Sequence, residues 1–173
     1  MPDKPDHQKA AEIVRDAGGT IVGRTRLQKV GCLLELAGLG SGFKFEYHYY
    51  GPYSEALTEA VRMAEAFDLM TEKEQVASWG GTYSIFTTSP GLGTPDSNDR
   101  SRFAQEAAKI DAIELELAAT AAFLAAVEGR ADAWEETARR KPDKAGNGRL
   151  EKAKLAYGHL SSLKSPKPLP NIL

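Results

Sequence analysis

Two motifs, one basic and one aromatic, constrain the fold of this chain more than any other feature. The basic motif is Gly-Arg-Thr-Arg-Leu-Gln-Lys-Val at residues 23–30, and the aromatic motif at residues 45–54 ends in Gly-Pro-Tyr-Ser. The first is typical of a turn leading into a helix. The second is typical of an extended segment that is broken by Gly-Pro and followed by a helix that Ser54 caps. This order favours a helical module of the DNA-binding type over a catalytic pocket.

The residues around these motifs predict the order of a winged helix. Apolar periodicity predicts helices over 7–17, 26–37 and 55–69, with a turn at 21–25 before the second helix. Residues 43–50 are expected to be a strand, and strands 75–77 and 82–88 flank a Gly-Gly turn that suits a hairpin. We therefore predict a winged helix-turn-helix domain over 1–90, with helix 55–69 in the recognition position and hairpin 75–88 as the wing.

The second half of the chain is predicted to be a helical bundle, which makes the fold α+β and mostly α. Residues 91–98 are rich in Gly and Pro and are expected to be a linker. One long helix, Arg100–Val127, and two shorter helices over 130–140 and 150–163 form the bundle, 99–164. Its stretch 115–127 is apolar on nearly every side, which predicts burial in the fold or in an oligomer, and we expect a homodimer through the C-terminal helices. Residues 165–173 contain prolines and are expected to be a flexible tail.

Composition and charge exclude several classes of protein. The formal net charge of −2 argues against a chain that coats nucleic acid without sequence preference. The charge is uneven, because residues 139–173 carry nine Lys or Arg against two acids, a net of +7 that leaves −9 for the rest. That asymmetry indicates either an acidic partner or a solvated tail. The single Cys32 excludes a disulfide framework and a cysteine-based zinc site. With no apolar signal or membrane-spanning segment, we expect a cytoplasmic protein.

The two motifs resemble those of a group of bacterial and archaeal proteins typified by YwgA, a winged-helix family. The resemblance lies in residues 23–29 and 45–54 and, more loosely, in 115–121. The Leu-Gln-Lys and Tyr-Gly-Pro segments also resemble, more loosely, those of Panacea (SocA-type) antitoxins. In this chain Gly31-Cys32 stands where larger hydrophobic residues are usual. The resemblance implies a winged helix in a regulatory or phage-defence context, and it brings no catalytic residues.

The candidate nucleic-acid contacts are basic residues near the predicted reading surfaces. Those at the start of the second helix could hold a duplex by its phosphates, and others lie on the recognition helix, the wing and the basic C-terminal region. The alternative is a solvated basic turn, with Arg24 paired to a carboxylate such as Glu46. The candidates are Arg24, Arg26, Lys29, Arg62, Lys73, Arg149 and Lys152.

The candidate protein contacts are aromatic. Tyr47, Tyr49, Tyr53 and Trp79 could grip a partner or stack on bases. The alternative is that these rings pack a strand against a helix. His48 has no histidine near it in sequence, so neither a metal site nor a cofactor is expected.

The predicted recognition helix weakens the DNA interpretation, because it carries Glu55, Glu59, Glu65 and Asp68 against a single base, Arg62. The sequence also lacks the motifs of common enzyme classes, so we expect no catalysis. Two hypotheses follow. The first is a DNA-binding transcriptional regulator, and the second is a protein-interaction subunit, such as an antitoxin-like or phage-defence accessory protein. Convergence of the basic candidates on one face would favour DNA. Scattered basic residues beside exposed aromatic residues would favour a protein partner.

Overall fold

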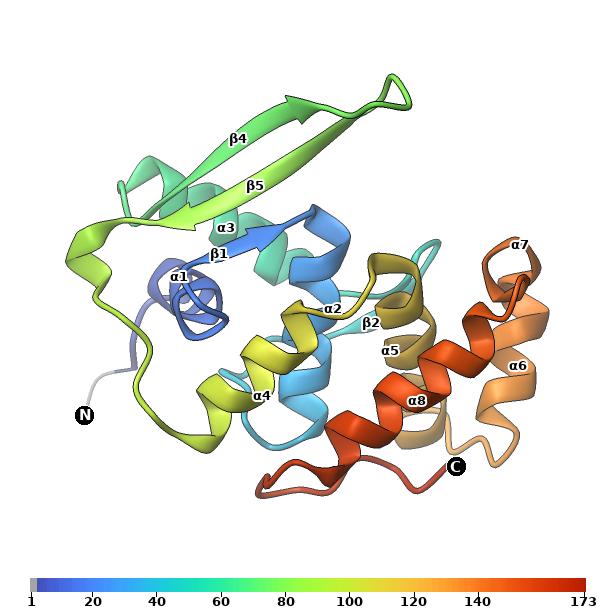
Figure 1. Ribbon diagram of the computed structural model, residues 1–173. Helices are drawn as coiled ribbons and strands as arrows, with labels where there is room; N and C mark the ends of the chain where they lie inside the picture. Colours follow the sequence, from blue (N-terminus) through green and yellow to red (C-terminus); the bar gives the residue numbers. More distant parts are fainter. Residues whose placement is uncertain (1–2) are drawn as a thin grey trace.

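Residues 3–173 are described in a computed structural model of the chain, and they form an α+β fold composed mainly of helices (Figure 1). The first half of the chain alternates helices with short strands. Its elements are α1 (Asp6–Asp16), β1 (Thr20–Val22), α2 (Arg24–Leu36), β2 (Glu46–His48), β3 (Gly51–Tyr53), α3 (Glu55–Ala66), β4 (Met70–Val76) and β5 (Thr82–Thr88).

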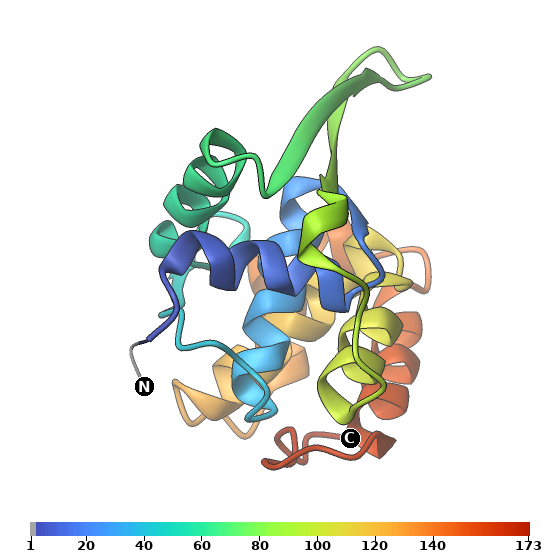
Figure 2. The same ribbon diagram turned by 90° about the vertical axis from the view of Figure 1, so that its left-hand side faces the viewer.

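Three of these strands form an antiparallel sheet in the order β1-β5-β4. Ile21 of β1 pairs with Phe86 of β5, and both side chains are buried, so this face of the sheet joins the core. The outer parts of β4 and β5 continue past the body of the protein as a projecting hairpin (Figure 2). The predicted Gly-Gly pair lies in the loop but is not the centre of its turn: the amide of Gly80 donates to the carbonyl of Ala77 at 3.0 Å, so Ser78 and Trp79 are the central residues. The amide of Ala77 donates to the carbonyl of Gly81 at 2.7 Å and closes the loop.

The aromatic motif folds differently from its prediction. The chain reverses at Tyr49 and Tyr50, two residues earlier than expected, and Gly51–Tyr53 is itself a strand paired with Glu46–His48. Pro52 is tolerated there because this hairpin has only two strands, so each strand has an open edge that needs no N–H donor. The predicted turn at 21–25 is likewise wrong: it contains the end of β1 and the start of α2.

The second half contains a short 3₁₀ turn and five helices among the described residues. They are η1 (Pro90–Leu92), α4 (Asp99–Ala108), α5 (Ala112–Ala126), α6 (Ala133–Arg140), α7 (Pro142–Ala145) and α8 (Arg149–Ser162). The prediction of one helix over Arg100–Val127 is wrong. Asp111 interrupts it, because its carboxylate accepts from the backbone amides of Ile113 and Glu114 and so begins a new helix.

Helix α5 is the centre of the fold. All ten residues from Leu115 to Leu124 are buried, and α5 contacts α2, β3, α6 and α8. Its apolar surface is therefore covered within a single chain, and the homodimer that we expected through this helix has no apolar face of 115–124 left to use. One continuous hydrophobic core extends from α1 to α8, across the predicted linker at 91–98.

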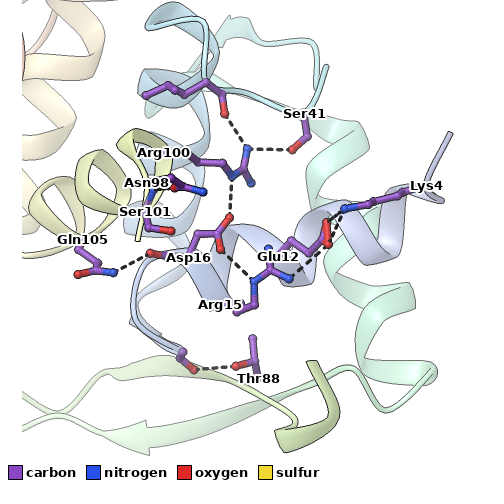
Figure 3. Close-up of polar contacts among 12 residues, drawn as sticks. Lys4, Glu12, Arg15, Asp16, Ser41, Thr88, Asn98, Arg100, Ser101 and Gln105 are labelled. Atoms are coloured by element: carbon purple, nitrogen blue, oxygen red, sulfur yellow. Dashed lines mark hydrogen bonds and ion pairs between the residues drawn. The ribbon is translucent and has the colours of Figure 1, made fainter. Parts of the chain in front are cut away.

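A buried ion pair fastens α4 to the first half (Figure 3). Arg100 donates from Nε to Oδ2 of Asp16 at 2.7 Å and from a terminal nitrogen to the carbonyl of Leu39 at 2.6 Å. Asp16 is 4% exposed and also accepts from Arg15 at 2.9 Å. Because a buried carboxylate needs such partners, this contact fixes the position of the bundle against α1.

The C-terminal segment 165–173, expected to be a flexible tail, packs against the body. Leu169 is buried, the amide of Lys167 donates to the carbonyl of Ala37 at 3.0 Å, and the hydroxyl of Tyr157 donates to the carbonyl of Pro170. Prolines keep this segment extended, and these contacts hold it in place. Within residues 3–173, no helix has the length and apolar character that crossing a bilayer requires.

The approach of β3 to α5 generates a prediction about Gly51. This residue has a φ of +88°, and a Cβ there would lie 2.7 Å from Oγ1 of Thr120. Gly80 has a similar φ of +93° with nothing within 4 Å. Gly80→Ala should therefore cost only backbone strain, about 1–2 kcal/mol of unfolding free energy. Gly51→Ala should cost about 1–3 kcal/mol more, because the side chain is also overpacked.

Urea unfolding of the two variants beside the wild type measures this difference. Equal losses of unfolding free energy in the two variants would contradict the close contact between β3 and α5.

Candidate functional site

Gln28 binds the backbone of Ser54 at two points. Its Oε1 accepts from the amide of Ser54 at 2.8 Å, and its Nε2 donates to the carbonyl of Ser54 at 3.0 Å. The hydroxyl of Ser54 caps α3, as predicted, by accepting from the amide of Leu57 at 3.1 Å. Both Gln28 and Ser54 are buried. The contact therefore fixes the start of α3 on the side of α2.

Lys29, the next residue, is also part of the core. Its side chain is buried, and Nζ donates to the carbonyl of Pro52 at 2.7 Å. Burial lowers the pKa of Lys29 from 10.5 to about 8, although the carboxylate of Glu116 acts in the opposite direction. In this position Lys29 does not reach solvent, so it is not available to a DNA phosphate. We call the contacts of Gln28 and Lys29 with residues 52–54 the backbone clamp.

Behind the backbone clamp, two lysines pair with one buried carboxylate, and its charge also acts on Lys29. Lys141 and Lys144 approach the same oxygen of Glu116, Oε2, at 3.2 Å and 2.6 Å. Glu116 is 2% exposed, and burial lowers the pKa of Lys141. Lys29 feels both the attraction of Glu116 and the repulsion of these two lysines. Lys29, Lys141, Lys144 and Glu116 form what we call the lysine cluster, which has more positive than negative charge.

Sequence reasoning missed the lysine cluster. Its signal was Glu116, the one acid within the otherwise apolar stretch 115–127. Because a buried carboxylate requires a cation, Glu116 predicts a basic partner from a distant segment. The pattern does not say which segment supplies it, and Lys141 and Lys144 lie far along the chain.

Arg24 and Arg26 make internal contacts. The Nε of Arg24 donates to Oε2 of Glu72 on β4 at 2.8 Å, so its carboxylate partner is Glu72 rather than Glu46. Arg26 donates to the carbonyls of Ile110, at 3.2 Å, and of Val22. Burial lowers the pKa of Arg26. Arg24 thus ties α2 to the hairpin, while Arg26 ties it to the turn between α4 and α5.

The other basic candidates lie on three different elements. Arg62 on α3 is paired with Glu59 at 3.1 Å, and Lys73 is exposed on β4. Arg149 and Lys152 lie in the first turn of α8, the end of that helix that adjoins α7 (Figure 1). The structure therefore brings Arg24, Lys29 and Arg62 to one pocket between α2, α3 and β4, whereas Arg149 and Lys152 lie on α8, which does not line that pocket.

Two of the four aromatic candidates pack against the body. Tyr47 lies beneath the guanidinium of Arg140, 4.7 Å from its ring centroid, and the hydroxyl of Tyr53 accepts from Thr58 at 2.7 Å. The other two face solvent: Tyr49 is 89% exposed at the β2–β3 turn, and Trp79 is 75% exposed at the end of the β4–β5 hairpin.

Trp79 does not stand alone at the end of the hairpin. Val76 is 77% exposed and Tyr83 is 38% exposed, and we call these three residues the apolar tip. The indole lies close over Gly81, where a Cβ would overlap the ring. The apolar tip therefore exposes apolar side chains on both faces of a projecting element, because Val76 pairs with Thr82 and Tyr83 pairs with Gln75, the neighbour of Val76 on β4. Among residues 3–173, no three His, Cys, Asp or Glu side chains are placed to hold a metal ion.

The burial of Lys29 generates a prediction about pH. Its pKa is lowered on folding, so the folded chain binds fewer protons than the unfolded chain between about pH 8 and pH 10.5. The contribution of Lys29 to the unfolding free energy therefore increases as the pH rises through this range. Across this pH range, we expect the unfolding free energy of the wild type to increase relative to that of Lys29→Met by at most about 3 kcal/mol. The exposed Lys73→Met is the control, and its difference from the wild type should stay constant.

Urea unfolding at the two ends of this range, about pH 8 and about pH 10.5, measures these differences in unfolding free energy. A difference for Lys29→Met that does not change with pH would contradict the burial of the charged amine.

Comparison with known proteins gives one partial likeness. The chain is 38% identical over 53 residues to the uncharacterized protein YwgA of Bacillus subtilis (strain 168). That match covers 31% of this chain and 31% of YwgA, so it spans about a third of either protein. No family model matches the chain, and no solved structure is significantly similar to it. Over this stretch the chain is YwgA-like, and the likeness goes no further.

Proposed function

We propose that this chain is a non-enzymatic, cytoplasmic protein-interaction subunit in which a winged-helix module presents the apolar tip to a protein partner. The order α1-β1-α2-α3-β4-β5 and the sheet order β1-β5-β4 support the winged-helix assignment. In that arrangement α3 has the recognition position and β4–β5 is the wing. The β2–β3 hairpin is an insertion before α3.

The observation that carries the proposal is the exposure of Val76 and Trp79 on the projecting hairpin. Burying an apolar side chain of this size is favourable by about 1.5–3 kcal/mol, and this chain leaves both of them in water. An exposed tryptophan on a projecting element is the type of residue that dominates binding energy at protein interfaces. The likeness of the Leu-Gln-Lys and Tyr-Gly-Pro segments to antitoxins also favours a protein partner.

Charge argues for a protein partner over DNA. The exposed face of α3 carries Glu55, Glu59 and Glu65, and its one arginine, Arg62, is paired with Glu59. This face would repel the phosphates of a major groove. Arg24, Arg26 and Lys29 are occupied by contacts within the chain. A partner with a basic surface beside an apolar pocket would complement α3 and the apolar tip together.

A photocrosslinking amino acid at position 79, in cells that naturally make the chain, tests the proposal. Position 155 on α8 is the control, since Leu155 is also 77% exposed. We expect position 79, but not position 155, to give an adduct with one protein, and Val76→Asp to remove the adduct. The purified partner should then bind Trp79→Ala at least about tenfold more weakly than the wild type, as expected for a residue at the centre of an interface.

Binding of the purified chain to random duplex DNA is the opposing outcome. Binding that weakens steeply with salt, and that Lys73→Glu abolishes, would replace the protein-partner proposal with the DNA-regulator hypothesis.

A further inference from the structure

A concave pocket of about 430 Å³ lies between the β2–β3 turn and the segment that joins α6 to α7. Residues 47–50 line one side, and residues 140–144 line the other. The volume lies within the range of small-molecule sites. The pocket is separate from the apolar tip, so the inference drawn from it does not depend on the proposed function.

The wall of the pocket is basic. Arg140, Lys141 and Lys144 line it, with Asp143 as the one acid among the lining residues. Arg140 is paired with Glu128 at 3.2 Å. Lys141 and Lys144, in contrast, share a single carboxylate oxygen of Glu116. The surplus positive charge of the lysine cluster therefore borders the pocket.

The surroundings of the lysine cluster reinforce this imbalance. Lys29 adds a third ammonium group that feels the charge of Glu116, and the pKa of Lys29 is lowered chiefly by burial, with repulsion from Lys141 and Lys144 adding to it. The Lys144 side chain is 34% exposed, so it connects the buried lysine cluster with solvent. An anion at Lys144 would balance the excess of positive charge that Lys141 and Lys144 have over the one carboxylate, Glu116, that they share.

Aromatic rings form the opposite wall. The ammonium of Lys144 lies 5.2 Å from the ring centroid of Tyr50, and Tyr49 meets Tyr50 edge-on at 5.1 Å. Because Tyr49 is 89% exposed, its ring is free to stack on a planar group. Lysine suits a phosphate group, and an adjacent free tyrosine suits a nucleobase.

We propose that this pocket binds a nucleoside phosphate, with the phosphate at Lys144 and Lys141 and the base against Tyr49. Isothermal titration with adenosine 5′-monophosphate, inorganic phosphate and adenosine tests the proposal. The monophosphate should bind more tightly than inorganic phosphate, and adenosine should not bind measurably.

Matched variants separate the two parts of the pocket. Lys144→Gln should weaken monophosphate binding at least tenfold, whereas Lys73→Gln, the same charge change on exposed β4, should leave it unchanged. Tyr49→Ala, which removes a solvent-exposed ring, should reduce the monophosphate to the affinity of inorganic phosphate. The melting temperature of each variant shows that it is folded. Binding that Lys73→Gln and Lys144→Gln weaken equally, or no binding at millimolar ligand, would overturn the proposal.

Discussion

The contact on which the rest of this structure depends is the backbone clamp. Gln28 and Lys29 are consecutive on α2, yet they reach the start of α3 and the strand before it. Together they fix where β3 ends and α3 begins. Each partner on residues 52–54 is a backbone group in the core, where an unpaired polar atom costs about 1–3 kcal/mol. The motif that looks like a nucleic-acid contact in the sequence therefore has a structural role.

Once the backbone clamp is set, α5 completes the core. β3 lies against α5 near Thr120, and the charge of Glu116 on the same helix acts on Lys29. The first half of the chain thereby covers an apolar helix that belongs to the second half. Because both halves of the chain contribute to one core, the surfaces that remain available to a partner are peripheral. They are the apolar tip of the hairpin and the exposed face of α3. This division of roles connects the fold with the proposed function.

Local features of the fold were predictable from sequence, and long-range contacts were not. Ser54 is the N-cap that its position before Glu55 indicates, and the β4–β5 hairpin forms around the loop that contains the Gly-Gly pair, although its turn is centred on Ser78 and Trp79. The break at Asp111 was missed, because the apolar periodicity of the flanking segments continues through it. The helical periodicity of this segment is compatible with a Lys29 that is exposed to solvent and equally with a Lys29 that is buried in the core. The choice depends on the carbonyl of Pro52, which the sequence does not place.

Hydrogen exchange at the amide of Ser54 tests the backbone clamp most directly, because that amide donates to Gln28. In a Gln28→Met variant, which keeps the length and the apolar part of the side chain, we expect faster exchange at the amides of Ser54 and Leu57. Exchange of the β4–β5 hairpin amides should stay unchanged. Unchanged protection of Ser54 in this variant would contradict the claim that the backbone clamp fixes the start of α3.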